Sequence, residues 1–412
     1  MRGSGRWVRT LPLLGPAFVA AVAYVDPGNF ATKFSSGASF GYRLLWVIVA
    51  ANLMAMLIQS LTAKLGVATG QDLATLCRQH FRRPVVWGLW VQAEAVAIAT
   101  DIAEIVGGAV ALNLLFGVPL PVGGAITAVV AFALLAAQGR GYRPFELIIA
   151  GLLSIIALGF AYTLFFAGID PVAVTGGLVP GFAGTESVVL ATGILGATVM
   201  PHVIYVHSAL TPKRYFLPDG STSTLTLRQR SRVLRTQRLD VLLAMGAAGL
   251  VNAAMLIIAA QLFSKLRRRG QHAGRGARRA GDADRRQYCG GVRRGSARLG
   301  LAASAVGTYA GQVVMAGFLR RRIPLFVRRL ITAIPAIALL AFGTDPTRAL
   351  VWSQVVLCFG IPFALIPLVW FTSRSDVMGG WANRRITTLA ACSVAGLIIG
   401  LNAYLLATLL LG

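Results

Sequence analysis

A short polar run interrupts the first apolar stretch of the chain, and its residue types could bind a cation. Residues 23–30 read AYVDPGNF. Asp26 offers carboxylate oxygens and Asn29 an amide oxygen, while Pro27 and Gly28 form turns and break helices. Such a run predicts either a kinked or early-ending span or a protected cavity with irregular backbone. The carboxylate favours the cavity, because ionisable groups inside a membrane are usually functional.

A second run of the same kind lies about 175 residues further along the chain. Residues 196–202 read GATVMPH, so Pro201 breaks a helix immediately after Met200. Carbonyls freed near Ala197 would add oxygen ligands, and the Met200 thioether would add a soft sulfur. Oxygen ligands alone suit Mg²⁺ or Ca²⁺, whereas the sulfur adds a preference for ions such as Mn²⁺ and Fe²⁺. The alternative is that Met200 only fills space, as most methionines in apolar spans do.

Three carboxylates follow one stripe of the third apolar segment. At about 100° per helical residue, Asp101 lies roughly 20° from Glu94, and Glu104 roughly 80°. Carboxylates on one stripe of a membrane helix cannot face lipid, and they predict a proton relay. The alternative is structural pairing with arginines or with backbone donors.

Two histidines and a glutamine complete the set of candidate polar groups. His202 follows the second break directly, and His207 lies one and a half turns beyond it. Imidazoles titrate near neutral pH, so either could carry protons, although a histidine in a helix is more often structural. Gln354 in a later apolar segment fits a ligand role and a packing role equally well.

The elements that position these residues are membrane spans. Hydrophobic residues make up 56% of the 412 residues and charged residues 13%, against about 25% charged in soluble domains. This composition argues against a soluble enzyme, a secreted scaffold and a disordered protein. A span needs about 20 apolar residues, and eleven are predicted, at 12–31, 44–66, 86–115, 120–138, 146–168, 188–210, 240–262, 299–318, 329–343, 349–372 and 388–411.

The basic residues predict the orientation of these spans. With the N-terminus in the cytoplasm, 24 of the 39 Lys and Arg residues lie in cytoplasmic segments. Three lie in outer segments, and 12 lie in one stretch, residues 263–298. Apart from that stretch the bias predicts a cytoplasmic N-terminus and an external C-terminus.

No cofactor or enzymatic chemistry is predicted from the remaining motifs. The four cysteines are isolated, there is no phosphate-binding loop motif, and no nucleophile–base set stands out. Transport driven by an ion gradient therefore fits better than an ATP-driven motor or an enzyme.

Taken together, the motifs resemble those of the natural resistance-associated macrophage protein (Nramp) family, which includes bacterial MntH-type metal transporters. The residues that carry the resemblance are DPGN at 26–29, QAE at 92–94, Asp101 with Glu104, ATVMPH at 197–202, and GIPF at 360–363. The resemblance implies an all-α polytopic membrane protein with a LeuT-like 5+5 inverted repeat and broken helices 1 and 6. The whole chain, 1–412, would be a single transmembrane domain, with repeats at about 11–168 and 188–372 and an extra helix at 388–411.

The same resemblance implies proton-coupled import of Mn²⁺ and Fe²⁺ across a bacterial inner membrane by alternating access. It assigns metal binding to Asp26, Asn29, the Ala197 carbonyl, Met200 and, as a helper, Gln354. It assigns the proton route to Asp26, His202, Glu104 and Asp101, with Glu94 and arginines of the ninth span as further candidates. The predicted partners are the metal ion, protons and the lipid bilayer, with no nucleic acid and no obligatory protein partner. An organic-solute symporter of the same fold and a transport-dead relative are the alternatives.

Two features depart from the family pattern. Lys33 follows the first motif, where a cation would either repel an entering metal or extend outward to water. Residues 263–298 hold 12 basic and 2 acidic residues with almost no apolar run. This segment could bind nucleic acid or anionic lipid, or be a divergent external loop. We favour a third explanation, a local frameshift, because GC-rich DNA read out of frame yields Arg, Gly and Ala.

Overall fold

The computed structural model describes residues 15–137, 151, 154–155, 157–165, 170–215, 227–272, 307, 310–319 and 325–411, and in these ranges the regular elements are helices without strands. The helices are α2 (Pro16–Ala23), α3 (Pro27–Phe40), α4 (Leu45–Thr69), α5 (Leu73–His80), α6 (Arg83–Phe116), α7 (Leu120–Ala137), α9 (Pro171–Gly176), α10 (Thr185–Thr198), α11 (Pro201–Tyr215), α12 (Leu227–His272), α14 (Leu325–Ala341), α15 (Pro346–Ser373), α16 (Ser375–Met378), the 3₁₀ turn η4 (Gly379–Trp381) and α17 (Arg385–Leu411). Residues 157–165 and Ala310–Leu319 are also helical.

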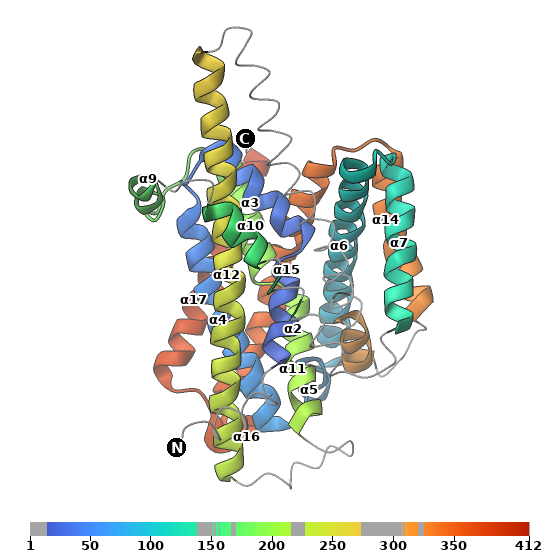
Figure 1. Ribbon diagram of the computed structural model, residues 1–412. Coiled ribbons are helices and arrows are strands. Elements are labelled where there is room, and N and C mark those ends of the chain that lie inside the picture. Colours follow the sequence, from blue (N-terminus) through green and yellow to red (C-terminus); the bar gives the residue numbers. More distant parts are fainter. Residues whose placement is uncertain are drawn as a thin grey trace, which may run out of the picture.

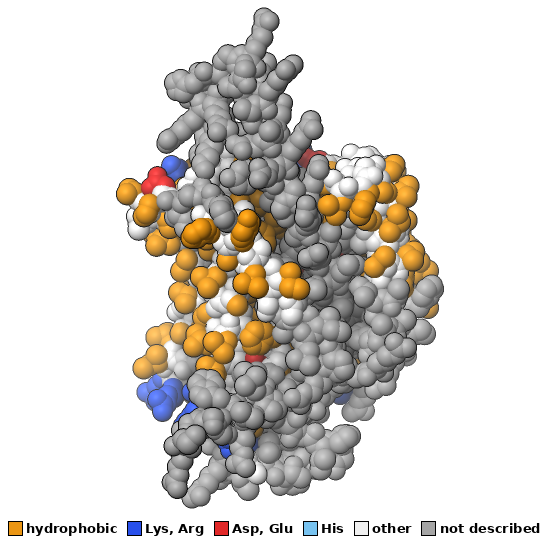
Figure 2. Space-filling view, in the orientation of Figure 1, with side chains coloured by type: hydrophobic (Ala, Val, Ile, Leu, Met, Phe, Trp, Pro, Cys, Tyr) orange, Lys and Arg blue, Asp and Glu red, His pale blue; other side chains and the backbone are white. Residues whose placement is uncertain are grey.

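Several helices are built to cross a bilayer. Within the described ranges, six are long and apolar enough: Leu45–Thr69, Arg83–Phe116, Gly184–Pro212, Gln229–Phe263, Pro346–Ser373 and Arg385–Leu411. Large apolar side chains such as Leu53 (60% exposed) and Leu250 (75% exposed) point outward from them. Figure 2 shows such side chains spread over the middle of the visible face. An outer surface of this kind fits lipid rather than water, so the chain is a multi-pass membrane protein.

Both predicted helix breaks are present, but two spans are longer than predicted. The first span was predicted to end at residue 31, whereas α3 continues to Phe40. Helix α12 extends beyond the predicted 240–262 at both ends and includes residues 263–272 of the Arg-rich segment. Residues 273–298 of that segment lie outside the described residues, as do parts of the predicted spans at 146–168 and 299–318.

The helices form two groups joined through α15 (Figure 1). In the larger group, α3 packs against α12, α10 and α15, and α4 packs against α11 and α12. In the smaller group, α6, α7 and α14 pack against one another, and α6 also packs against α15. The two broken segments, α2–α3 and α10–α11, therefore lie inside the protein and away from its lipid-facing surface.

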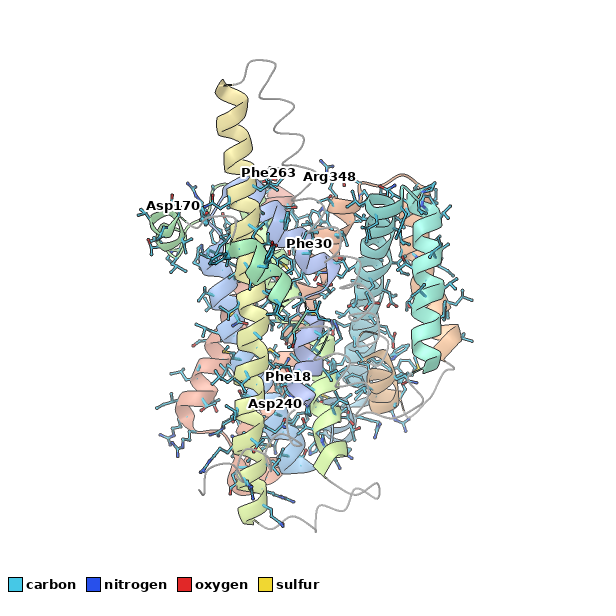
Figure 3. All side chains as sticks on the ribbon, viewed as in Figure 1. Phe18, Phe30, Asp170, Asp240, Phe263 and Arg348 are labelled. Atoms are coloured by element: carbon cyan, nitrogen blue, oxygen red, sulfur yellow. The ribbon has the colours of Figure 1, made fainter. Side chains whose placement is uncertain are left out.

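Hydrogen bonds show which connecting segments share an end of the molecule. The Lys64 ammonium donates to Asn383 Oδ1 at 2.7 Å, which joins two segments predicted to be cytoplasmic. The Trp46 N–H donates to the Gly177 carbonyl at 3.0 Å, which joins the start of α4 to a segment predicted to be external. Figure 3 shows Asp170 and Arg348 at the opposite end of the molecule from Asp240. Each of the two bonds therefore joins positions that the predicted topology assigns to the same end of the spans.

A buried carboxylate fixes the start of α2. Asp240 on α12 is fully buried, and its oxygens accept the N–H groups of Gly15 (3.1 and 3.2 Å) and Ala17 (3.0 Å). Figure 3 places it beside the beginning of α2, near Phe18. The first N–H groups of a helix have no partner within the helix, so a carboxylate from another helix satisfies them and anchors α2 to α12.

Replacement of Asp240 by Ala is expected to destabilise the fold. It leaves buried N–H groups without an acceptor, which costs about 1–3 kcal/mol. Thermal unfolding of the purified protein in detergent measures the effect as a lower Tm. Asp170→Ala is the matched control, because Asp170 caps α9 through the same kind of bond at an exposed position. Equal Tm values for the two variants would contradict the anchoring role.

Candidate functional site

The first break lies between Ala23, where α2 ends, and Pro27, where α3 begins. Asp26 caps α3, and its Oδ1 accepts the Asn29 N–H at 2.7 Å. Asp26 is 2% exposed and Asn29 is fully buried. The Asn29 amide N–H₂ donates to the Tyr24 carbonyl, so a side chain replaces one of the helical bonds that the break removes. The break is thus a defined turn that holds a carboxylate inside the protein.

The second break lies between Thr198, where α10 ends, and Pro201, where α11 begins. In a continuous helix the Ala197 carbonyl would accept the N–H of residue 201, but proline has no N–H to give. The sequence itself therefore frees this carbonyl at a fully buried position. Met200 lies in the break and is 1% exposed.

Gln354 on α15 touches both breaks. Its Nε2 donates to Asp26 Oδ2 at 3.4 Å, and its side chain packs directly on Gly28. Its backbone carbonyl packs on Gly196, the residue before Ala197. Although 328 residues separate Gln354 from Asp26, Gln354 contacts residues that flank both breaks. The two breaks therefore lie near each other, with Gln354 between them.

Two buried amide oxygens in this region have no hydrogen-bond partner among the described residues, Asn29 Oδ1 and Gln354 Oε1. Both residues are fully buried, where an unsatisfied polar oxygen is costly. A bound cation would satisfy both oxygens together with the Asp26 carboxylate. The donor set thus fits a metal ion with mostly oxygen ligands and the Met200 sulfur as the soft member.

The site contains fewer charged groups than a resident metal centre usually has. Among the described residues, no three His, Cys, Asp or Glu side chains form a group that could hold a metal ion. Asp26 would be the one carboxylate ligand, with neutral oxygens and a sulfur around it. Such a set neutralises only part of a divalent charge, which suits an ion that must leave again.

The α6 carboxylates lie beside the second break. Asp101 is 8% exposed and Glu104 is 1% exposed. Thr100, the neighbour of Asp101, contacts His202 with 3.4 Å between Oγ1 and Nδ1. The structure therefore brings His202 to the inner part of the predicted stripe. Glu94 lies about 10 Å from Asp101 along the helix axis and is only partly buried.

His207 belongs to a different group of polar residues. Its Nδ1 is 2.7 Å from Gln59 Oε1, and the Gln59 amide donates to the Tyr24 hydroxyl. This chain connects α11 and α4 to the end of α2. Sequence analysis did not select Gln59 or Tyr24, although a glutamine inside an apolar span is a recognisable signal.

Asn252 on α12 was also missed. Its Oδ1 accepts from Asn29 Nδ2 at 2.9 Å, and it is fully buried. This bond and the bond to the Tyr24 carbonyl both use the Asn29 amide nitrogen, while the amide oxygen has no hydrogen-bond partner among the described residues. An asparagine in the middle of the most apolar span could have indicated this role, but its partner could not be read from the sequence.

Lys33 lies inside α3 and is fully buried, so its side chain does not extend outward to water. The sequence placed it in an outer segment because the predicted span ended at residue 31. The longer α3 moves this position into the packed interior.

Close backbone contacts hold the two breaks in place. A Cβ on Gly196 would overlap the Gln354 carbonyl and lie 2.8 Å from the Cys358 N atom on α15. A Cβ on Gly107 of α6 would overlap the Pro27 ring. Only glycine lets α10 approach α15, and α6 approach α3, this closely. These two glycines therefore set the spacing of the helices around the breaks.

Gly196→Ala is expected to destabilise the protein, because the added methyl group overlaps backbone atoms that cannot move independently. The expected cost is about 1–3 kcal/mol, seen as a lower Tm in detergent. Gly246→Ala on α12 is the matched control, since its Cβ would meet only Met56 Cε at 3.9 Å. If Gly196→Ala unfolds at the same temperature as the control, α10 and α15 are not in contact as described.

Comparison with known proteins places these features in context. The family model "Natural resistance-associated macrophage protein-like" matches residues 17–408. The divalent metal cation transporter MntH of Bacillus subtilis is 50% identical over 397 residues, covering 96% of this chain and 92% of that protein. MntH of Mycobacterium tuberculosis H37Rv is 52% identical over 397 residues, covering 96% and 91%.

Solved structures agree with these relatives. The Eremococcus coleocola manganese transporter, crystallised with an aromatic bis-isothiourea substituted compound, has a TM-score of 0.82 and 29% identity, covering 98% of this chain and 87% of that one. Mhp1, a nucleobase-cation-symport-1 family transporter, has a TM-score of 0.56 at 16% identity, covering 96% and 93%. The second likeness concerns the fold alone.

Proposed function

The chain belongs to the Nramp family, and on that premise we propose that it imports the divalent ions Mn²⁺ and Fe²⁺. The observation that carries the proposal is the position of Gln354, which contacts both helix breaks beside two unpartnered amide oxygens. The names of the relatives support the same substrate class, because they are divalent metal cation and manganese transporters. These are transporters rather than enzymes, and the metal is a substrate with no resident cofactor.

We assign the metal ligands to Asp26, Asn29, the Ala197 carbonyl and Met200, with Gln354 as a helper. The C-terminal end of α10 presents the Ala197 carbonyl, which Pro201 leaves without its helical N–H donor, and the negative end of a helix dipole attracts a cation. Asp26 supplies the only negative charge in the set. The Met200 sulfur raises affinity for transition metals relative to Ca²⁺ and Mg²⁺, whose binding depends on oxygen alone.

Alternating access would use the two breaks as hinges. Each break separates two half-helices, so one half can tilt without unwinding the other. The LeuT-like 5+5 repeat predicted from the sequence is supported by the likeness to Mhp1. In this scheme the site around Gln354 stays fixed while the helices on either side open in turn.

Proton coupling would pass through the groups next to the second break. His202 contacts Thr100 beside Asp101, and Glu104 lies one turn further along α6. We propose that a proton enters with the metal and moves from Asp26 through His202 to these carboxylates. Glu94 would act nearer the membrane surface, where it is less buried.

We place the protein in the cytoplasmic membrane of a bacterium with its N-terminus inside. The bacterial relatives support the location. The bond between Lys64 and Asn383 supports the orientation, because it joins two segments that the positive-inside rule assigns to the cytoplasm.

The alternatives are an organic-solute symporter and a transport-dead product of a damaged gene. The Met200 sulfur and Asp26 argue against an organic solute. The Arg-rich residues 263–298 are the argument for damage. Reading the gene in its other two frames across this stretch tests the frameshift, which predicts an apolar segment in one of them. If both frames lack such a segment, the frameshift proposal fails.

Uptake of Mn²⁺ by a bacterium lacking its own importer tests the proposed function. We expect uptake that rises as the medium is acidified, because protons move inward with the metal. Asp26→Ala is expected to abolish uptake, since it removes the only charged ligand. Asp170→Ala, an exposed carboxylate far from the breaks, serves as the control. Equal uptake by Asp26→Ala and the unaltered protein would rule out this site.

A further inference from the structure

The Lys33 ammonium is buried without a hydrogen bond. Lys33 lies in the second turn of α3, its side chain is fully buried, and Nζ has no hydrogen-bond partner among the described residues. Lysine normally keeps its charged end in water, and an isolated buried charge is very costly. A lysine that keeps its charge in this position therefore needs an opposite charge nearby.

The helical spacing places Lys33 on the same side of α3 as the metal site. It follows Asp26 by seven residues, which is about 20° around the helix and roughly 10 Å along it. It follows Asn29 by four residues, one turn further from the break. Asp26 is the only acidic residue between Pro16 and Phe40, so it is the opposite charge that α2 and α3 offer to Lys33.

The surroundings on α12 supply no other charge to this face. Asn29 bonds to Asn252 of α12, and Gly37 packs on Leu256 and Ala259 of the same helix. Lys33 lies between Asn29 and Gly37 in the sequence, so its neighbours on α12 come from residues 252–259. These read NAAMLIIA and contain no acidic residue.

We propose that Lys33 is an internal cation that competes with the metal ion for Asp26 and thereby sets the affinity of the site. Without metal, the lysine balances the Asp26 carboxylate. With metal bound, the two cations repel each other across the same carboxylate, so binding is weakened and release is favoured. This inference rests on the proposed function, because it assigns a property to that metal site.

Neutral substitutions separate the charge of Lys33 from its packing. Lys33→Met keeps the length and apolar stem of the side chain and removes the charge, and Lys33→Gln is a second neutral variant if Met perturbs folding. Lys33→Arg keeps the charge. Lys64→Met is the matched control, since it makes the same change at a lysine that bonds to Asn383 outside the site.

Isothermal titration of Mn²⁺ into the purified full-length protein measures the effect. One charge acting on a divalent ion at roughly 10 Å changes binding by about tenfold or more, so Lys33→Met and Lys33→Gln should bind with a Kd about tenfold lower. Lys33→Arg and Lys64→Met should bind like the unaltered protein.

The outcomes distinguish this inference from the proposed function. If both neutral variants bind Mn²⁺ with unchanged or weaker affinity while the unaltered protein binds, Lys33 does not compete with the metal ion. The inference is then overturned, whereas the proposed function stands. A tenfold gain in Lys64→Met as well would also overturn it, because the effect would not be local. If neither the unaltered protein nor the neutral variants bind Mn²⁺, the proposed function fails and this inference fails with it.

Discussion

Every backbone N–H and C=O group inside a bilayer must find a partner within the protein, because the lipid offers none. Two of the membrane segments of this chain give up part of their helical bonding, at Tyr24–Asp26 and at Val199–Met200. The surrounding structure compensates for that loss. Asp26 and the Asn29 amide bond to the backbone around the first break, and helices α3, α6, α10, α12 and α15 enclose both breaks away from lipid.

The compensation is incomplete around Gln354, and this gives the fold its proposed chemistry. The Ala197 carbonyl has no helical donor, because Pro201 lacks an N–H. The side-chain oxygens of Asn29 and Gln354 have no hydrogen-bond partner within the described part of the chain. These groups lie around the contact between Gln354 and the two breaks. Oxygen atoms that are buried, unsatisfied and adjacent to a carboxylate form a place where a cation is more stable than an empty space. The oxygen atoms that the structure leaves unsatisfied around the breaks therefore also form the proposed metal site.

Much of this could be predicted from the sequence, because the signals are local. Pro27, Gly28 and Pro201 break helices through their own covalent structure, and both breaks occur where they were predicted. The end of α3 was missed because its polar residues seemed unsuited to a membrane. Within the helix, however, Thr32 and Ser36 donate their hydroxyl protons to backbone carbonyls at 2.9 and 2.6 Å, so they need no water.

Contacts between distant segments could not be predicted in the same way. Periodicity shows which face of a helix is polar, but it does not identify the helix that packs there. The bond between Gln354 and Asp26, the bond between Asn252 and Asn29, and the Asp240 cap on α2 all depend on tertiary packing. The burial of Lys33 has the same origin, since it follows from the extra length of α3.

The central claim is that both helix breaks supply side-chain ligands to one metal ion. X-ray absorption spectroscopy at the manganese edge, on Mn²⁺ bound to the purified protein, tests it most directly. Our account predicts a shell of oxygen ligands with a single sulfur, and loss of that sulfur in Met200→Leu while the oxygen shell remains. An all-oxygen shell in the unaltered protein, the same in Met200→Leu, would contradict it, because the second break would then contribute no side chain to the ion.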